Sequence, residues 1–184
     1  MSEELIVRHC SPTLAGIKTG NIFSCSFEDE RELEDFLREH NSRLSRKGLR
    51  MIPLRRSENS ALIYVYRPGL LRRDLEKSEV GSILESFGYG GLSTGSCIAR
   101  LMRRLDAENG FPHEIGCFLG YPPEDVRGFI ENGAKGCKFS GCWKVYGSVE
   151  KAKKLFASYK KCTEVYCRCY RNGRSIERLC VGTT

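Results

Sequence analysis

The sequence predicts an α/β or α+β fold, a single domain with an open mixed sheet of about four to six strands flanked by helices. Segments with apolar residues at helical spacing follow shorter segments in which apolar and polar residues alternate. The length of 184 residues is ordinary for one domain, and the 40% hydrophobic and 29% charged residues are typical of globular proteins. We therefore expect residues 1–184 to enclose one hydrophobic core.

A short first helix is expected shortly after the N-terminus. Ser11 would be its N-cap, and Pro12 would be its first residue, where the missing N–H costs nothing. Cys10 would then lie at the positive end of this helix.

The remaining elements follow from periodicity, caps and turn residues. Ser26 and Asp29 form a capping-box-like helix start, and Pro53 indicates a strand at a sheet edge or with a bulge. Expected helices lie at about residues 26–44, 70–87, 94–105, 122–132 and from 148 on, and expected strands at 21–27, 49–56, 61–67, 142–146 and 176–181.

The ten cysteines resemble those of reduced proteins more than those of a disulfide scaffold. Disulfide scaffolds are short, loop-rich and preceded by an export signal, whereas these cysteines mostly lie in periodic segments and residues 1–4 are acidic. No apolar run reaches the roughly 18 residues that span a bilayer. We expect a cytoplasmic protein with reduced thiols and no membrane segment.

The net charge of +7 is unevenly distributed. The segment after Phe27 is acidic, a first basic cluster follows it from Arg43 to Arg73, and a second extends from Lys135 through Arg178. A basic surface attracts RNA, a phosphorylated ligand or an acidic protein such as a flavodoxin-like electron carrier, and the alternative is a solvated face. Because the chain lacks a zinc finger or another nucleic-acid signature, we do not expect nucleic-acid binding.

Cys10 is the first candidate for chemistry, because unpaired N–H groups at a helix start favour the reactive thiolate. It would act as a nucleophile, a sulfur carrier or a metal ligand. His113, followed by Glu114, is the candidate base for a cysteine–histidine pair. The alternative for Cys10 is a small buried residue in the core.

Cys137, Cys142, Cys162 and Cys167 resemble two halves of a thiolate site for zinc or an iron–sulfur cluster. The spacing argues against such a site, because compact metal knuckles have two to four intervening residues. In a helix, Cys162 and Cys167 would point about 140° apart.

Two turn-rich segments are candidate binding loops. Residues 88–96 are rich in glycine and hydroxyls of the kind that hold phosphate, but they match neither the P-loop nor the dinucleotide fingerprint, and a plain connection is the alternative. Residues 111–123 surround His113 with aromatic, proline and glycine residues. Trp143, Lys144 and Tyr146 would line the same pocket or anchor a core.

Three segments, 9–18, 111–132 and 143–147, resemble the domain-of-unknown-function family 3793, which is found mainly in anaerobic bacteria and has no assigned activity. The chain departs from the family pattern with cysteine at 117, usually aliphatic, and at 142, usually a large aromatic. The resemblance implies accessory roles in iron handling or flavodoxin-type electron transfer. It favours these residues as functional: Cys10, His113 and Glu114, with Tyr121, Pro122, Pro123, Asp125, Trp143, Lys144 and Tyr146 as binding residues.

The leading expectation is an accessory protein that handles a metal such as iron, a sulfur species or a redox partner. It would do so through Cys10 and the loop from His113 to Tyr121. The alternatives are a thiol-dependent enzyme with Cys10 as nucleophile and His113 as base, and a structural or RNA-associated module. The sequence indicates no particular cofactor, metal or oligomeric state.

Overall fold

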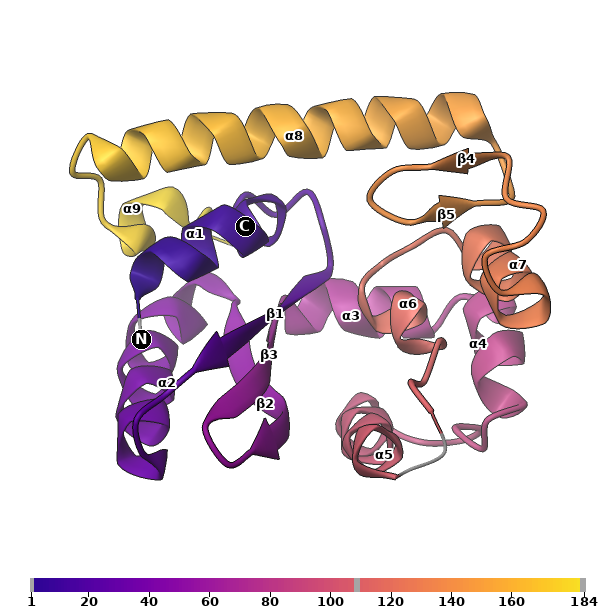
Figure 1. The fold of residues 1–184 in the computed structure, drawn as a ribbon, viewed down its shortest axis with the longest axis horizontal. Helices are drawn as coiled ribbons and strands as arrows, with labels where there is room; N and C mark the ends of the chain where they lie inside the picture. Colours follow the sequence, from indigo (N-terminus) through magenta and orange to yellow (C-terminus); the bar gives the residue numbers. More distant parts are fainter. Residues whose placement is uncertain (1, 108–109, 183–184) are drawn as a thin grey trace. The chain divides into compact units, whose positions relative to one another are not determined.

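The computed structural model describes residues 2–107 and 110–182, which divide by their contacts into two compact units (Figure 1). The first unit holds the chain up to Leu71 and from Cys162 onwards, and the second holds Arg72–Lys161. Each unit has a hydrophobic cluster of its own. A single domain over residues 1–184 stays a prediction.

The first unit contains a three-stranded antiparallel sheet in the order β1-β3-β2. Its core joins apolar side chains of the sheet to those of the helices. The elements are α1 (Glu3–Leu14), β1 (Gly20–Ser26), α2 (Glu30–Leu44), a 3-10 turn (Ser45–Lys47), β2 (Arg50–Ser57), β3 (Ser60–Tyr66), the end of α8 (Val149–Arg171) and α9 (Ile176–Leu179).

The predicted start of the first helix is wrong. Helix α1 begins at Glu3, where the side chain of Ser2 accepts the N–H of Glu4, and Pro12 lies in its last turn. The Ser11 hydroxyl donates to the carbonyl of Val7 one turn earlier instead of capping a new helix. Buried apolar residues at helical spacing before Ser11 explain the longer helix.

The predicted start of the second helix is one turn too early, because Ser26 ends β1 and Asp29 is the N-cap of α2, whereas the prediction for Pro53 is confirmed. Asp29 is the N-cap of α2 and accepts the N–H of Glu32 at 2.8 Å, while Glu32 accepts the N–H of Glu28 at 2.8 Å. Strand β2 lies at the edge of the sheet, and its register shifts between Pro53 and Arg55. Proline is tolerated here because an edge strand leaves one row of N–H groups outside the ladder.

The predicted last strand over 176–181 is wrong, because Ile176–Leu179 form the short helix α9. Ile176, Leu179 and Cys180 are buried. Their spacing of three and four residues is helical, but the segment is too short for periodicity alone to distinguish a helix from a strand.

The second unit is mostly helical, with a small antiparallel hairpin. The predicted helix over 70–87 is two helices, because the chain turns between Glu76 and Lys77. Ser148 caps α8 as predicted, accepting the N–H of Lys151 at 3.4 Å. The elements are the end of α3 (Pro68–Leu75), α4 (Ser78–Glu85), α5 (Thr94–Asp106), α6 (Ile115–Phe118), α7 (Pro123–Asn132), β4 (Phe139–Ser140), β5 (Lys144–Val145) and the start of α8.

The predicted mixture of helices and strands is confirmed, but the predicted single mixed sheet is not. The paired strands are antiparallel and form one three-stranded and one two-stranded sheet in the described residues. Within the same residues, no helix combines the length and the apolar character needed to cross a membrane.

Candidate functional site

Asp125 at the start of α7 holds the hairpin and the loop that follows it. Its side chain is buried, with only 3% exposed. One carboxylate oxygen, Oδ2, accepts the indole Nε1–H of Trp143 at 2.7 Å, and Oδ1 accepts the backbone N–H groups of Tyr146 and Gly147 at 2.7 and 2.8 Å. Three strong hydrogen bonds engage both oxygens, so this carboxylate fixes the local backbone.

Trp143 lies at the centre of an aromatic cluster beneath the hairpin. Its ring stacks on Tyr121 with centroids 4.5 Å apart and meets the edge of Phe156 at 4.5 Å. Tyr159 lies at 6.5 Å. Burial is the main cause that raises the pKa of both Tyr121 and Tyr159 to about 12, so these phenols stay neutral at ordinary pH. The aromatic faces of this region are used in its own packing.

The structure thus brings four predicted binding residues together: Tyr121, Asp125, Trp143 and Tyr146. Their contacts are with one another and explain a rigid hairpin. Lys144 lies on the hairpin itself, where its Nζ donates to the hydroxyl of Ser140 at 3.0 Å. Ligand binding by these residues stays a prediction.

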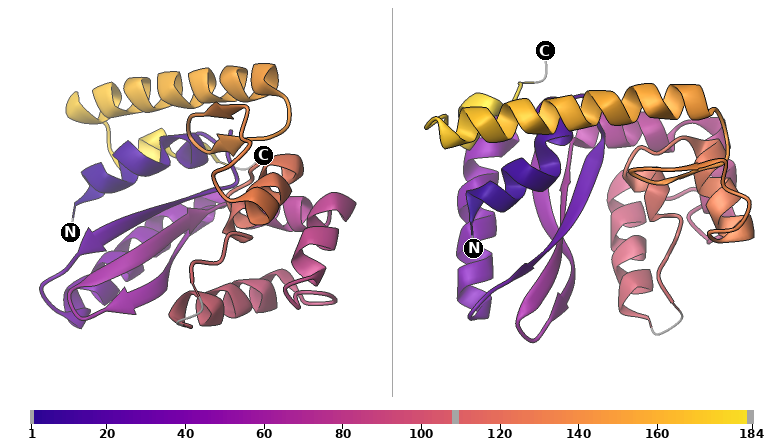
Figure 2. Two further views of the ribbon diagram at one scale, coloured as in Figure 1. Left: turned by 45° about the vertical axis from the view of Figure 1, so that its right-hand side comes forward. Right: turned by 45° about the horizontal axis from the view of Figure 1, so that its top comes forward.

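Lysines cover the outside of this cluster. Figure 2 shows the β4–β5 hairpin beside the first turns of α8, where Lys153 Nζ lies 5.0 Å from the centroid of the Phe139 ring. Residues 133–161 contain eight lysines, all exposed except Lys144, which is half-buried. The one carboxylate side chain in this range belongs to Glu150. We call this set the lysine surface: Lys135, Lys138, Lys144, Lys151, Lys153, Lys154, Lys160 and Lys161.

Cys142 lies in the turn between β4 and β5, within the lysine surface, and is the exposed thiol among the ten cysteines. No disulfide joins any of the ten, all of which lie in the described residues. Cys137, Cys162 and Cys167 are half-buried.

The structure assembles no metal centre from these thiols. Cys162 and Cys167 both lie on α8, where five residues turn the side chains about 140° apart. Among the described residues, no group of three or more histidine, cysteine, aspartate or glutamate side chains is placed to hold a metal ion.

Cys10 occupies the third turn of α1 and has no exposed surface. The expected position at a helix N-terminus is therefore wrong, because α1 begins seven residues earlier, at Glu3. Burial in the apolar core raises the pKa of the Cys10 thiol far above its usual range. The electrostatic activation expected of this thiol is absent.

His113 and Glu114 are neighbours in the second unit but occupy different environments. His113 is exposed, and its ring meets Phe129 edge-on at 4.8 Å. Glu114 is completely buried; its Oε1 accepts the hydroxyl of Tyr89 at 3.1 Å and pairs with Arg104 Nε. Its Oε2 is buried with no hydrogen-bond partner in the described residues.

Glu114 also affects its neighbours electrostatically. Burial raises the pKa of Tyr89, and the negative charge of Glu114 raises it further. The same two causes, burial first, raise the pKa of Cys117 to about 12. The loop from His113 to Tyr121, a candidate binding loop in the sequence, contains the buried helix α6.

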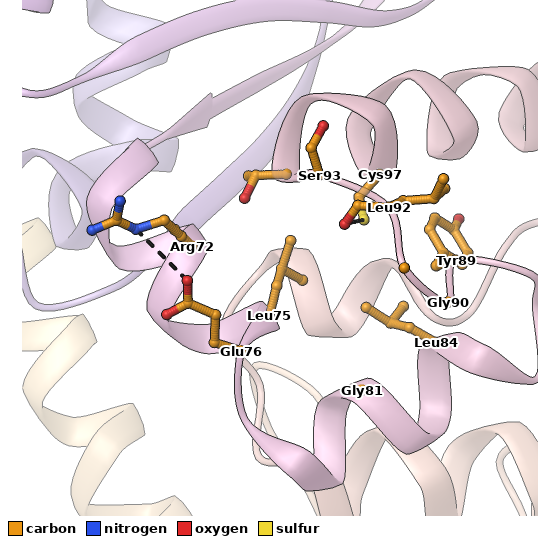
Figure 3. A pocket seen from close by; sticks show the side chains of 12 residues that line it. Arg72, Leu75, Glu76, Gly81, Leu84, Tyr89, Gly90, Leu92, Ser93 and Cys97 are labelled. Carbon is orange, nitrogen blue, oxygen red and sulfur yellow. Dashed lines mark hydrogen bonds and ion pairs between the residues drawn. The ribbon is translucent and has the colours of Figure 1, made fainter.

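A cavity of about 410 Å³ beside the glycine-rich turn was not identified from the sequence as a pocket (Figure 3). Tyr89 contributes to its wall. The available signal was the run of glycine and hydroxyl residues over 88–96. The remaining lining comes from the neighbouring helices, and periodicity alone does not reveal how these helices pack around a cavity.

Comparison with curated proteins and with solved structures finds no match. The model of the family described as "Protein of unknown function (DUF3793)" matches residues 6–180, which is nearly the whole chain. The match includes all three segments from which the resemblance was inferred. The chain therefore belongs to this family of proteins of unknown function.

Proposed function

We propose that the chain is an accessory protein that docks an acidic, flavodoxin-type protein on its lysine surface. The observation that carries this proposal is the concentration of charge. The eight lysines exceed the single glutamate of residues 133–161 by seven, which equals the net charge of the whole chain. The rest of the chain is balanced, so this one region supplies the surplus that attracts and orients an acidic partner.

The scaffold beneath the lysines supports this role. Asp125 ties the hairpin to α7, and the Trp143 cluster ties it to α8. The backbone that carries the lysines is therefore ordered before a partner binds, so docking requires no ordering of this segment. Of the lysines, Lys154 forms an ion pair with Glu150 at 2.8 Å, a pair that is exposed and adds little stability.

An acidic protein suits this surface better than a nucleic acid does. Residues 133–161 contain no arginine, the side chain best suited to forked contacts with phosphates and guanine. Trp143 and Tyr159 are each only 9% exposed and pack inwards. The surface therefore lacks the stacking platform that single-stranded nucleic acids use.

The burial of Cys10 argues against sulfur handling or nucleophilic catalysis by that residue. Docking on the lysine surface does not depend on it. Cys142 lies within the surface and provides an accessible reporter of contact.

The test is a titration of the full chain with an acidic flavodoxin. We expect binding that weakens steeply between about 50 and 300 mM salt, because exposed charges are screened over about 10 Å at 0.1 M salt. The triple variant Lys151→Glu, Lys160→Glu and Lys161→Glu should weaken binding by at least about tenfold. Bound flavodoxin should also slow the alkylation of Cys142.

The matched control reverses three exposed arginines of the first unit, Arg8, Arg46 and Arg55, to glutamate. This control carries the same change in net charge and should retain binding within about twofold. Equal losses in both triple variants would show attraction by net charge alone and overturn the proposal. Tighter binding of RNA than of flavodoxin at equal salt, or no binding of flavodoxin, would overturn it as well.

A further inference from the structure

The cavity beside the glycine-rich turn is built entirely within the second unit. It has a volume of about 410 Å³, within the range of roughly 300–1,000 Å³ that is usual for small-molecule sites. Its lining comes from α3, α4, the turn that includes Tyr89–Ser93, and the start of α5 (Figure 3).

The inner wall of the cavity is apolar. Leu75, Leu84, Tyr89 and Cys97 line it, and the last three are at most 5% exposed. Tyr89 is held from behind, because its hydroxyl donates to the buried carboxylate of Glu114, which pairs with Arg104. This wall is therefore preorganised to receive an apolar group.

The rim carries one cationic and one anionic side chain, Arg72 and Glu76, among the residues that line the cavity. Arg72 lies on α3 and Glu76 directly follows its last residue, with Arg72 Nε 3.9 Å from Glu76 Oε1, and their side chains are 69% and 67% exposed. An exposed pair at this distance contributes little stability, so both groups are available to a ligand. Figure 3 shows this pair on one side of the cavity and Tyr89 and Cys97 on the other.

We propose that this cavity binds a small zwitterion with an apolar body, of the class of the apolar α-amino acids. The carboxylate of the ligand pairs with Arg72, its ammonium group pairs with Glu76, and its side chain packs on Leu84 and Tyr89. The ammonium nitrogen and the carboxylate carbon of an α-amino acid are bonded to the same carbon, so its two opposite charges are close enough to face Arg72 and Glu76 together. This site is separate from the lysine surface and does not depend on partner docking.

The first test is calorimetric titration of the full chain with L-phenylalanine and L-leucine. N-acetyl-phenylalanine lacks the ammonium charge and phenethylamine lacks the carboxylate, so each should bind at least about tenfold more weakly than phenylalanine. Equal binding of all three aromatic compounds would overturn the zwitterion assignment. No binding of either amino acid would overturn the site.

Gly81 offers a variant that blocks the cavity without disturbing the fold. It lines the cavity within α4, and a Cβ at this position would meet no atom within 4 Å. Gly81→Leu should abolish binding without lowering the thermal midpoint. Gly69→Leu is the matched control, because Gly69 is also helical, has equally open space and does not line the cavity.

A second pair of variants tests the rim. Arg72→Gln should weaken phenylalanine binding by at least about tenfold, whereas Arg73→Gln, at the adjacent exposed position outside the lining, should leave it unchanged. Binding by Gly81→Leu that equals the unaltered chain would contradict the proposal. Equal losses in the two arginine variants would contradict the assigned role of Arg72.

Discussion

At the scale of single residues, two carboxylates organise the second unit in different ways. Asp125 uses both oxygens to hold the hairpin backbone and the indole of Trp143. Glu114 uses one oxygen for Tyr89 and Arg104 and leaves the other buried without a partner in the described residues. Both oxygens of Asp125 thus have hydrogen-bond partners, whereas Glu114 keeps one oxygen that can still accept a hydrogen bond behind the cavity wall.

Replacing Asp125 tests the contribution of its hydrogen bonds. Asp125→Asn keeps the shape of the side chain but turns an amide N–H₂ group towards N–H donors, so at least one donor loses its partner. We expect a loss of about 2 to 4 kcal/mol in the free energy of unfolding, measured by urea denaturation followed by circular dichroism. Asp106→Asn, at an exposed helix end, is the control and should change little. An Asp125→Asn protein as stable as the unaltered chain would refute that contribution.

Replacing a glycine by alanine should have opposite effects on stability at two helical positions. A Cβ at Gly128 in α7 would lie 2.3 Å from Cγ of Tyr146, whereas a Cβ at Gly81 in α4 would meet nothing within 4 Å. Gly128→Ala should destabilise the chain by about 1 to 2 kcal/mol, because overpacking exceeds the gain in helix propensity. Gly81→Ala should stabilise it by about 0.5 to 1 kcal/mol. Thermal unfolding of both variants measures the contrast, and equal signs would contradict it.

At the scale of elements, charged side chains join α1, α2 and α9 in the first unit. Arg43 on α2 pairs with Glu177 on α9 and, through Nη1, with Glu3 on α1 at 3.2 Å. The Nε2 atom of the buried His40 lies 3.3 Å from the same Glu3 carboxylate. These contacts fasten the first helix and the last helix to α2.

This cluster predicts a specific acid sensitivity. The hydrogen bond from Arg43 lowers the pKa of Glu177 from 4.5 to about 2. Since the folded pKa lies below the unfolded pKa, the stabilisation is present above pH 4.5 and is lost as the pH falls towards 2. Between pH 5 and pH 2.5, the unaltered chain should therefore lose more stability than Glu177→Gln does. Urea midpoints at the two pH values measure this difference.

Glu34→Gln, at an exposed position of α2, is the control for this experiment. Its acid sensitivity should match that of the unaltered chain. If Glu177→Gln also matches the unaltered chain, the pairing with Arg43 does not contribute to stability.

The elements that the sequence predicts well are those with local signals. Asp29 and Ser148 cap α2 and α8, and the turn before Ser60 closes the β2–β3 hairpin. The start of α1 is missed because Ser11 and Pro12 match the usual residues of an N-cap and a first helical position, whereas Pro12 lies in the last turn of a helix that begins at Glu3. The division of strands into two sheets depends on long-range pairing, which has no local signal.

The candidate sites follow the same rule. The basic run from Lys135 is visible in the sequence, and so is the chemistry of Asp125 and Trp143. Neither the burial of Cys10 nor the cavity near Tyr89 is visible, because both result from side chains that come together only after folding.

At the scale of the whole molecule, charge is distributed independently of apolar packing. Outside residues 133–161 the chain has equal numbers of basic and acidic residues, so the surplus of seven positive charges lies in that one segment. Such an asymmetry accelerates association with an acidic partner more than it strengthens the final complex. Stability and partner choice can therefore vary separately in this chain.

The chain has one tryptophan, and it is wedged between two aromatic rings while its indole nitrogen binds a carboxylate. Fluorescence excited at wavelengths that only tryptophan absorbs therefore comes from the second unit alone. It does not report the unfolding of the three-stranded sheet. Tryptophan fluorescence can thus follow the unfolding of the second unit, while hydrogen exchange of the backbone amides in the sheet follows the first. The order in which the two units unfold can be measured without attaching a dye.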